Sequence, residues 1–129
     1  MSPSPLPAPA LAVTEKSISG ALAKDSNGNP SICATPATKS TFLTTDPQAG
    51  VWLTFDGAHN GDVLAFRWIH PSGTVDAYQP TTRLNFNGSG CAAWFISVNG
   101  GPPAAETGVW QVEVQINGDY LLALPFTIR

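Results

Sequence analysis

Apolar and polar side chains alternate most regularly near the C-terminal end of the chain, over residues 108–129. A period of two is typical of a β-strand with one buried face and one solvated face. The first arm places four large apolar residues at every second position: Trp110, Val112, Val114 and Ile116. The dipeptide Asn117-Gly118 follows and favours a tight hairpin turn. The pattern therefore predicts a closing β-hairpin.

Two registers are open to this hairpin. A two-residue turn at Asn117-Gly118 puts the apolar residues of the second arm on the polar face of the first arm. A three-residue loop over 117–119 pairs Val114 with Leu122 and Trp110 with Phe126, so that the large apolar side chains share one face. Because a one-residue slip moves every side chain to the opposite face, we predict the longer loop, accompanied by a bulge.

Pro125 lies inside the second arm and lacks a backbone N–H. In the predicted register its ring points outward. We therefore expect this last strand to lie at a sheet edge, or to have its hydrogen-bond ladder interrupted there.

Short apolar segments separated by Gly, Pro, Asn or Asp recur along the rest of the chain. They predict strands within residues 11–23, 40–45, 51–55, 63–70, 75–78, 83–86 and 91–98. The inward face of the segment 91–98 is not fixed by alternation, and no stretch carries a helical period. Many short strands with turn residues between them are typical of an antiparallel β-sandwich or a small barrel.

Composition narrows the class of protein. The length of 129 residues suits a single domain with a real core. Charged residues make up only 12% of the chain, about half the usual share, which is common in secreted β proteins. A net charge of −3 with scattered Lys and Arg argues against nucleic-acid binding. No segment is apolar for long enough to insert into a membrane.

Proline occupies every second position near the N-terminus, between Pro3 and Pro9. Residues 1–10 are therefore predicted to be an extended linker or tail, and residues 11–129 a single β-sandwich domain. Such linkers often join the modules of secreted multidomain proteins. Met1 followed by a Pro-rich segment is not a signal peptide, so an export signal would lie outside these residues.

The two cysteines, Cys33 and Cys91, are predicted to form a disulfide, because the composition and the linker favour an extracellular setting. Two unrelated buried thiols are the alternative. Neither His59 nor His70 has zinc-ligand spacing to a cysteine. We expect no metal site and no cofactor.

No catalytic group of residues emerges. His59 and His70 are expected to be solvated loop residues, and no nucleophile stands beside a base. A loop calcium site at Asp56, Asn60 and Asp62 is the nearest thing to an acidic cluster, but it lacks the ordering of a calcium loop.

The aromatic residues carry more information. Trp68 and Trp110 are expected in the core. Trp52 faces away from the apolar side of its strand, so it is the best candidate for an exposed ring that stacks on a sugar or anchors a protein; the alternative is that the N-terminal segment covers it. Tyr78 and Trp94 are further candidates for such a ligand-binding face.

Two motifs carry a resemblance to a known family. A strand ends in W-x-x-P-x-G at Trp68, Pro71 and Gly73, and the chain closes with G-x-W-x-V-x-V-x-x-N-G beginning at Gly108. Over residues 40–129 the chain resembles the immunoglobulin-like or fibronectin-like accessory domains of bacterial secreted proteins. A weaker resemblance is to the P-domain of proprotein convertases, a jelly roll with a P-S-G-T turn.

The first resemblance implies an antiparallel immunoglobulin-like sandwich of about seven to nine strands. A Cys33–Cys91 bond in such a domain would tie the N-terminal segment to a middle strand. It would differ from the bond that joins the two sheets of antibody domains.

The expected function is that of a non-catalytic accessory module, a spacer or protein-interaction domain, in an exported multidomain protein. Its setting would be extracellular or at the cell surface. Its partners would be neighbouring domains or another protein. The alternative is a carbohydrate-binding module in which Trp52, Tyr78 and Trp94 contact a polysaccharide.

Overall fold

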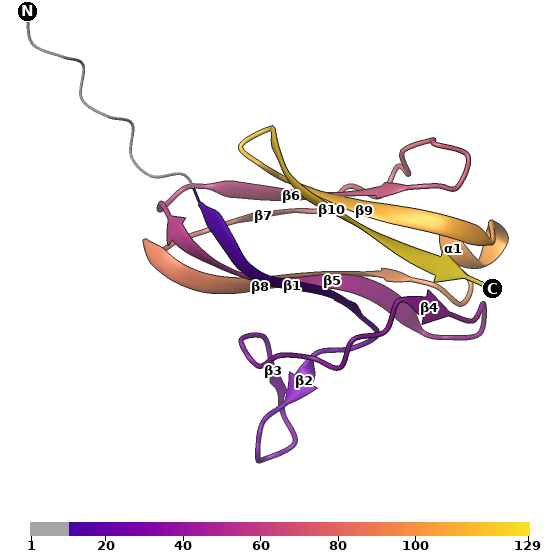
Figure 1. Ribbon diagram of the computed structural model, residues 1–129, viewed down its shortest axis with the longest axis horizontal. Coiled ribbons are helices and arrows are strands. Elements are labelled where there is room, and N and C mark those ends of the chain that lie inside the picture. Colours follow the sequence, from indigo (N-terminus) through magenta and orange to yellow (C-terminus); the bar gives the residue numbers. More distant parts are fainter. Residues whose placement is uncertain (1–10) are drawn as a thin grey trace, which may run out of the picture.

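The computed structural model describes residues 11–129, so the predicted Pro-rich linker at residues 1–10 lies outside the described residues. Two sheets pack face to face (Figure 1). The smaller sheet has the strand order β1 (Ala12–Ser19), β5 (Gln48–Ala58) and β8 (Gly88–Ser97). The larger has the order β4 (Thr41–Phe42), β10 (Asp119–Ile128), β9 (Gly108–Ile116), β6 (Val63–Ile69) and β7 (Thr81–Arg83). All pairs are antiparallel except β10 with β4, which confirms the all-β sandwich.

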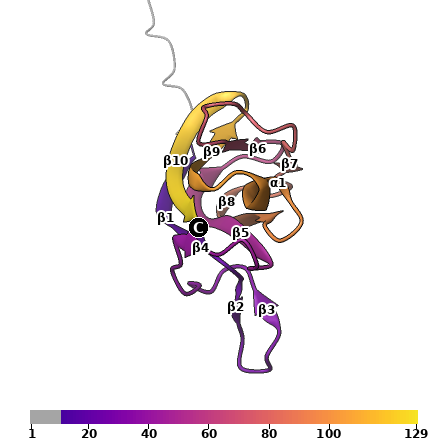
Figure 2. The ribbon, with the colours of Figure 1, turned by 90° about the vertical axis from the view of Figure 1, so that its right-hand side faces the viewer.

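Two further elements lie outside the sandwich layers. The short strands β2 (Ala23–Lys24) and β3 (Pro30–Ser31) form a hairpin that projects away from the smaller sheet (Figures 1 and 2). A single helical turn, α1 (Pro102–Ala105), occupies the Pro/Gly-rich loop before β9. Proline suits the start of a helix because its missing N–H has no partner there in any case.

The predicted strand at 75–78 is wrong. Only Val75 pairs, as an isolated bridge with Ile69. The Asp76 carboxylate accepts a hydrogen bond from the backbone N–H of Tyr78 (2.9 Å), and such a turn bends the chain away from an extended course.

The core lies where the alternating faces of the two sheets meet. Trp68 and Trp110 are fully buried there, as predicted. Phe126 packs against both, with ring centroids 6.2 Å and 6.3 Å away respectively. The structure also fixes the face of β8 that alternation left open, since Ala92 and Ile96 belong to the core and Trp94 packs against it.

The closing hairpin combines the two registers. Asp119 lies opposite Ile116, so the turn has two residues, Asn117 and Gly118, and the predicted three-residue loop is wrong. Both turn residues have positive φ, 51° and 87°, as a primed hairpin turn requires. A register shift between Tyr120 and Leu122 then absorbs one residue.

Beyond that bulge the predicted pairs are present, with Leu122 opposite Val114 and Phe126 opposite Trp110. The extra residue thus sits in a bulge, and the apolar faces still align. Pro125 is exposed. The neighbouring strand β4 pairs with β10 only at Thr127 and Ile128, so the missing N–H of Pro125 breaks no ladder on that side.

Asn117 ties this turn to the loop between β5 and β6. Its amide nitrogen donates to Asp62 Oδ1 (3.0 Å), and its amide oxygen accepts from the Val63 N–H (2.9 Å). The Asn117 amide, followed by the backbone N–H of His59, holds the pKa of Asp62 below its ordinary value. Hydrogen bonds that favour the charged carboxylate have this effect.

Replacing Asn117 with alanine is expected to cost about 1–3 kcal/mol, because two hydrogen bonds and the residue suited to positive φ are lost. A carboxyl with a lowered folded pKa adds stability above about pH 4, which is lost as the pH falls further. The Asn117→Ala variant should therefore lose less unfolding free energy between pH 5 and pH 2 than the parent protein. Urea unfolding across that range measures both effects; equal acid slopes would contradict the role of Asn117.

Candidate functional site

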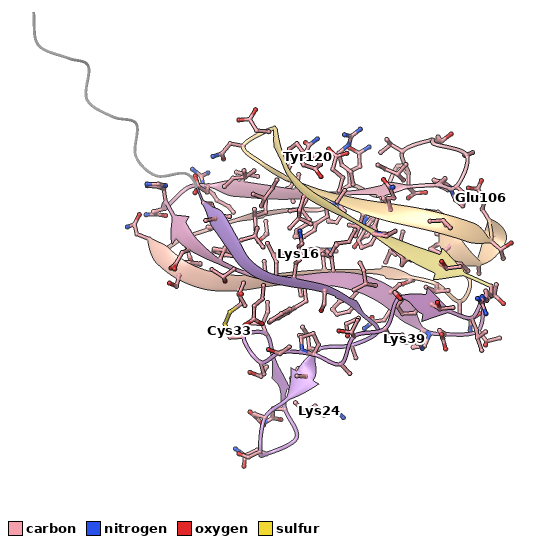
Figure 3. The ribbon with its side chains drawn as sticks, viewed as in Figure 1. Lys16, Lys24, Cys33, Lys39, Glu106 and Tyr120 are labelled. Atoms are coloured by element: carbon pink, nitrogen blue, oxygen red, sulfur yellow. A yellow bond between two sulfur atoms is a disulfide. The ribbon has the colours of Figure 1, made fainter. Side chains whose placement is uncertain are left out.

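A covering segment, residues 31–39, lies across the outer face of the β1–β5–β8 sheet. The disulfide between Cys33 and Cys91 fastens it to β8, with Cα atoms 5.3 Å apart. Lys39 donates its N–H to the carbonyl of Ile18 on β1 (2.9 Å), and Ser19 Oγ donates to the carbonyl of Ala37 (2.9 Å). Figure 3 shows the disulfide between the sheet and the segment beneath it. The predicted bond, and its difference from an inter-sheet pin, are confirmed.

Trp52 lies under this segment. It is on the outer face of β5, as the alternation predicts, but it is only 1% exposed. Its indole Nε1 donates to the carbonyl of Ile32 (2.5 Å). Of the two alternatives for Trp52, the exposed stacking ring is therefore wrong and the ring covered by the N-terminal segment is confirmed. The covering segment removes the ring from solvent and satisfies its N–H.

Tyr78 and Trp94 lie together at the side of the sandwich formed by β7 and β8. Trp94 Nε1 donates to the Tyr78 hydroxyl oxygen (2.7 Å). The Trp94 ring stacks on Phe66 of the core, with centroids 5.7 Å apart and planes 29° apart. Tyr78 is 43% exposed. Two of the three predicted ligand-binding residues thus form one aromatic pair that joins the core to the surface.

Two hollows adjoin at this pair. The first, of about 280 Å³, is lined by residues 82–86, Cys91, Ala92, Ala93, Trp94 and Ile32. The second, of about 320 Å³, is lined by Tyr78, Phe95, Ile96, Ser97 and Pro102. Trp94 lines the first hollow and its hydrogen-bond partner Tyr78 lines the second, so the two hollows follow one another along β8 on either side of this pair. We call the two hollows together the edge groove.

Phe95 also lines this groove, although it is not among the site residues predicted from the sequence. It lies opposite Gly50 on β5, and a Cβ at position 50 would collide with the Phe95 ring. Glycine therefore lets the ring lie across the neighbouring strand. A glycine within the strand β5 was the only signal of this contact available in the sequence.

His70 differs from the expected solvated loop residue. Its ring packs against Trp110, with centroids 4.0 Å apart. Nε2 is hydrogen-bonded to Asp76 Oδ1 (2.8 Å), and Nδ1 lies 3.3 Å from Glu106 Oε2. The ring thus links the turn after β6 to the segment between α1 and β9. His59, by contrast, is exposed as predicted.

Replacing His70 with alanine should lower the free energy of unfolding by about 1–3 kcal/mol, because Asp76 loses a partner and Trp110 loses its cover. The matched change His59→Ala, at an exposed side chain, should stay within about 0.5 kcal/mol. Urea unfolding followed by tryptophan fluorescence compares the two variants. Equal effects would mean that the His70 contacts are not stabilising.

The acidic residues considered for calcium are engaged in separate local contacts. Asp56 is hydrogen-bonded to Ser89, while Asp62 accepts from the His59 N–H (2.8 Å) and from Asn117. Among residues 11–129, no group of three or more His, Cys, Asp or Glu side chains could hold a metal ion. In the same part of the chain, no helix has the length and apolar character needed to cross a membrane.

No protein-family model matches the sequence, and no curated protein matches it. Solved structures do match. An immunoglobulin-like protein from Pseudomonas aeruginosa has a TM-score of 0.56 and 9% identity, with 95% of this chain and 98% of that chain covered. Alkylpurine DNA glycosylase AlkC from Pseudomonas fluorescens, bound to DNA containing an abasic site analogue, has a TM-score of 0.55 and 11% identity, with 92% of this chain but 30% of that chain covered. At these identities the likeness concerns fold alone, and it shows that the chain adopts an immunoglobulin-like β-sandwich.

Proposed function

We propose that this chain is a non-catalytic protein-interaction module of an exported multidomain protein. The observation that carries the proposal is the edge groove, which is lined by Tyr78 and by Trp94 and Phe95 of β8. Partly exposed aromatic side chains set against a rigid core are typical anchors for protein partners.

The remaining chemistry supports binding over turnover. The edge groove is lined mainly by apolar side chains, and Arg83 is its one charged lining residue. The His70 ring nitrogens already face two carboxylates, and Trp110 packs against the ring. The disulfide supports an oxidising, extracellular or cell-surface setting, where such bonds persist.

A carbohydrate-binding module is the second candidate. With Trp52 covered, sugar stacking would fall to Tyr78, which is exposed, while Trp94 already stacks on Phe66. One partly exposed ring offers a smaller platform than the three residues expected from the sequence.

Two assays on the chain and on a Tyr78→Ala variant separate these functions. We expect a displayed peptide library to yield binders whose affinity falls about tenfold with the variant, since an aromatic anchor is lost. The Tyr120→Ala variant is the matched control, because Tyr120 is 66% exposed on the closing hairpin (Figure 3). Retention on cellulose, chitin or xylan that depends on Tyr78 would instead establish the second candidate. Absence of Tyr78-dependent peptide binding would overturn the first.

A further inference from the structure

The two sheets have four edge strands, and three of them have features that discourage pairing with another chain. Strand β4 has two residues and β7 has three. Strand β1 contains Glu15 and Lys16 and is interrupted by a bulge between Val13 and Glu15. Short length, charge and bulges are the usual protections of exposed sheet edges.

Strand β8 has none of these protections along the groove. It has ten residues, GSGCAAWFIS, without a charged residue or a proline. It is the last strand of the smaller sheet and pairs only with β5. Its register with β5 is continuous from Phe55 opposite Gly90 to Gln48 opposite Ser97. A long, uncharged edge is a template for a further strand.

The hydrogen-bond phase fixes which backbone groups point outward. Val98 donates its N–H to the carbonyl of Pro47 (3.0 Å), and this pair continues the register of β5 with β8. Groups that face the partner strand alternate along an antiparallel ladder. Trp94, at an even position like Val98, therefore faces β5, whereas Ala93 and Phe95 point their N–H and C=O groups away from it.

The pairing of β1 with the opposite side of β5 leads to the same assignment of inward and outward backbone groups. Ile18 on β1 lies opposite Val51, and the Ile18 carbonyl accepts from Lys39 outside the sheet. Val51 therefore directs its own groups toward β8, where Trp94 is its partner. Among residues 11–129, no backbone hydrogen bond reaches the outward groups of Cys91, Ala93 or Phe95.

The edge groove runs along this same stretch, since residues 91–94 line its first hollow and residues 95–97 its second. The stretch is about 20 Å long in an extended strand. Ile32 and residues 82–86 flank it in the first hollow, and Tyr78 and Pro102 flank it in the second. An added strand takes up only about 5 Å beside β8, whereas the edge of a second copy would bring its own flanking segments against these walls.

We infer that β8 binds an extended segment of a partner polypeptide, which adds as a fourth strand to the β1–β5–β8 sheet. Backbone pairing to Cys91, Ala93 and Phe95 supplies affinity, and the hollows take alternate apolar side chains. Arg83 forms no ion pair among residues 11–129, so an acidic residue at that end of the segment is favoured. This inference rests on the proposed protein-interaction function.

The test uses a blocked peptide of about seven residues, which spans Cys91 to Phe95 with one residue to spare at each end. It has alternating valine and threonine and a glutamate at one end. Two isomers each carry three N-methyl groups on alternate amides, in opposite phases. Only one phase removes the N–H groups that pair with β8. We expect that isomer to bind at least about tenfold more weakly than the other. Composition and hydrophobicity are the same in both.

Amide hydrogen exchange on the intact chain gives a second readout. Bound peptide should slow exchange at Ala93 and Phe95, while Trp94, already paired with β5, should not change. Equal binding of the two isomers, or no binding at millimolar peptide, would overturn strand addition. Library peptides that need Tyr78 but leave exchange at Ala93 unchanged would retain the interaction function and overturn only this mode. Dimerisation that protects the same amides would replace the partner polypeptide with a second copy.

Discussion

Replacing Trp52 with alanine is expected to lower the free energy of unfolding by about 3–5 kcal/mol, the usual cost of removing a large buried aromatic side chain. Trp52 is almost fully buried between β5 and the covering segment. Its removal leaves a cavity on the outer face of the smaller sheet and leaves the Ile32 carbonyl without its donor. Urea unfolding followed by far-ultraviolet circular dichroism measures the loss without relying on the missing fluorophore.

Two control variants test whether the loss of stability comes from removing a buried ring. Tyr120→Ala removes an exposed ring and should change stability by less than about 0.5 kcal/mol. Trp52→Phe keeps most of the buried ring but removes the N–H, so it should fall between the parent protein and Trp52→Ala. A negligible effect of Trp52→Ala would mean that the ring is solvent-exposed and that the stacking surface predicted from the sequence exists after all.

Removing the disulfide through Cys33→Ser together with Cys91→Ser should cost about 4 kcal/mol in the chain-entropy model, given that the cysteines are separated by 58 positions in the sequence. The physical reason is that the unfolded chain regains the freedom that the closed loop denies it. Chemical reduction of the parent protein should give the same loss, measured by urea unfolding. The double variant should not respond to the reductant.

The Trp52 and disulfide effects should not add. Both act on the covering segment, because Ile32 accepts from Trp52 and Cys33 is bonded to Cys91. Once the bond is absent, the segment holds Trp52 less firmly, so Trp52→Ala should cost less by about 0.5–3 kcal/mol. Strict additivity would indicate that the segment stays in place without its disulfide.

The closing hairpin shows which structural features the alternation of apolar and polar residues can predict. The period of two placed Trp110, Val112 and Val114 on one buried face, and the structure confirms it. The predicted loop length was wrong for a simple reason. Alignment of the apolar faces sets the number of residues between two paired positions, but it does not say whether an extra residue lies in the turn or in a later bulge. A two-residue turn with a later bulge satisfies the same count, and the positive φ of Asn117 and Gly118 suits the shorter turn.

The candidate site was harder to predict, since its parts come from distant segments. Trp94 pairs with Tyr78 across sixteen residues, and the strand predicted at 75–78 gave no hint of that contact. The sequence predicts a solvated His70, yet Asp76 and Glu106 approach it from two different loops. Contacts between loops depend on how the sheets bring their ends together, which local patterns do not encode.

The sequence by itself determined the all-β class and the burial of Trp68 and Trp110. It also determined the residue pairs of the closing hairpin beyond its bulge. The reason is that the alternation of side chains is a local property of a strand. Only the tertiary structure decided that Trp52 is covered and that β8 presents an open edge. Both depend on where residues 31–39 and the β7 side of the sandwich come to lie, and burial of an outward-facing residue is set by whatever segment packs over it.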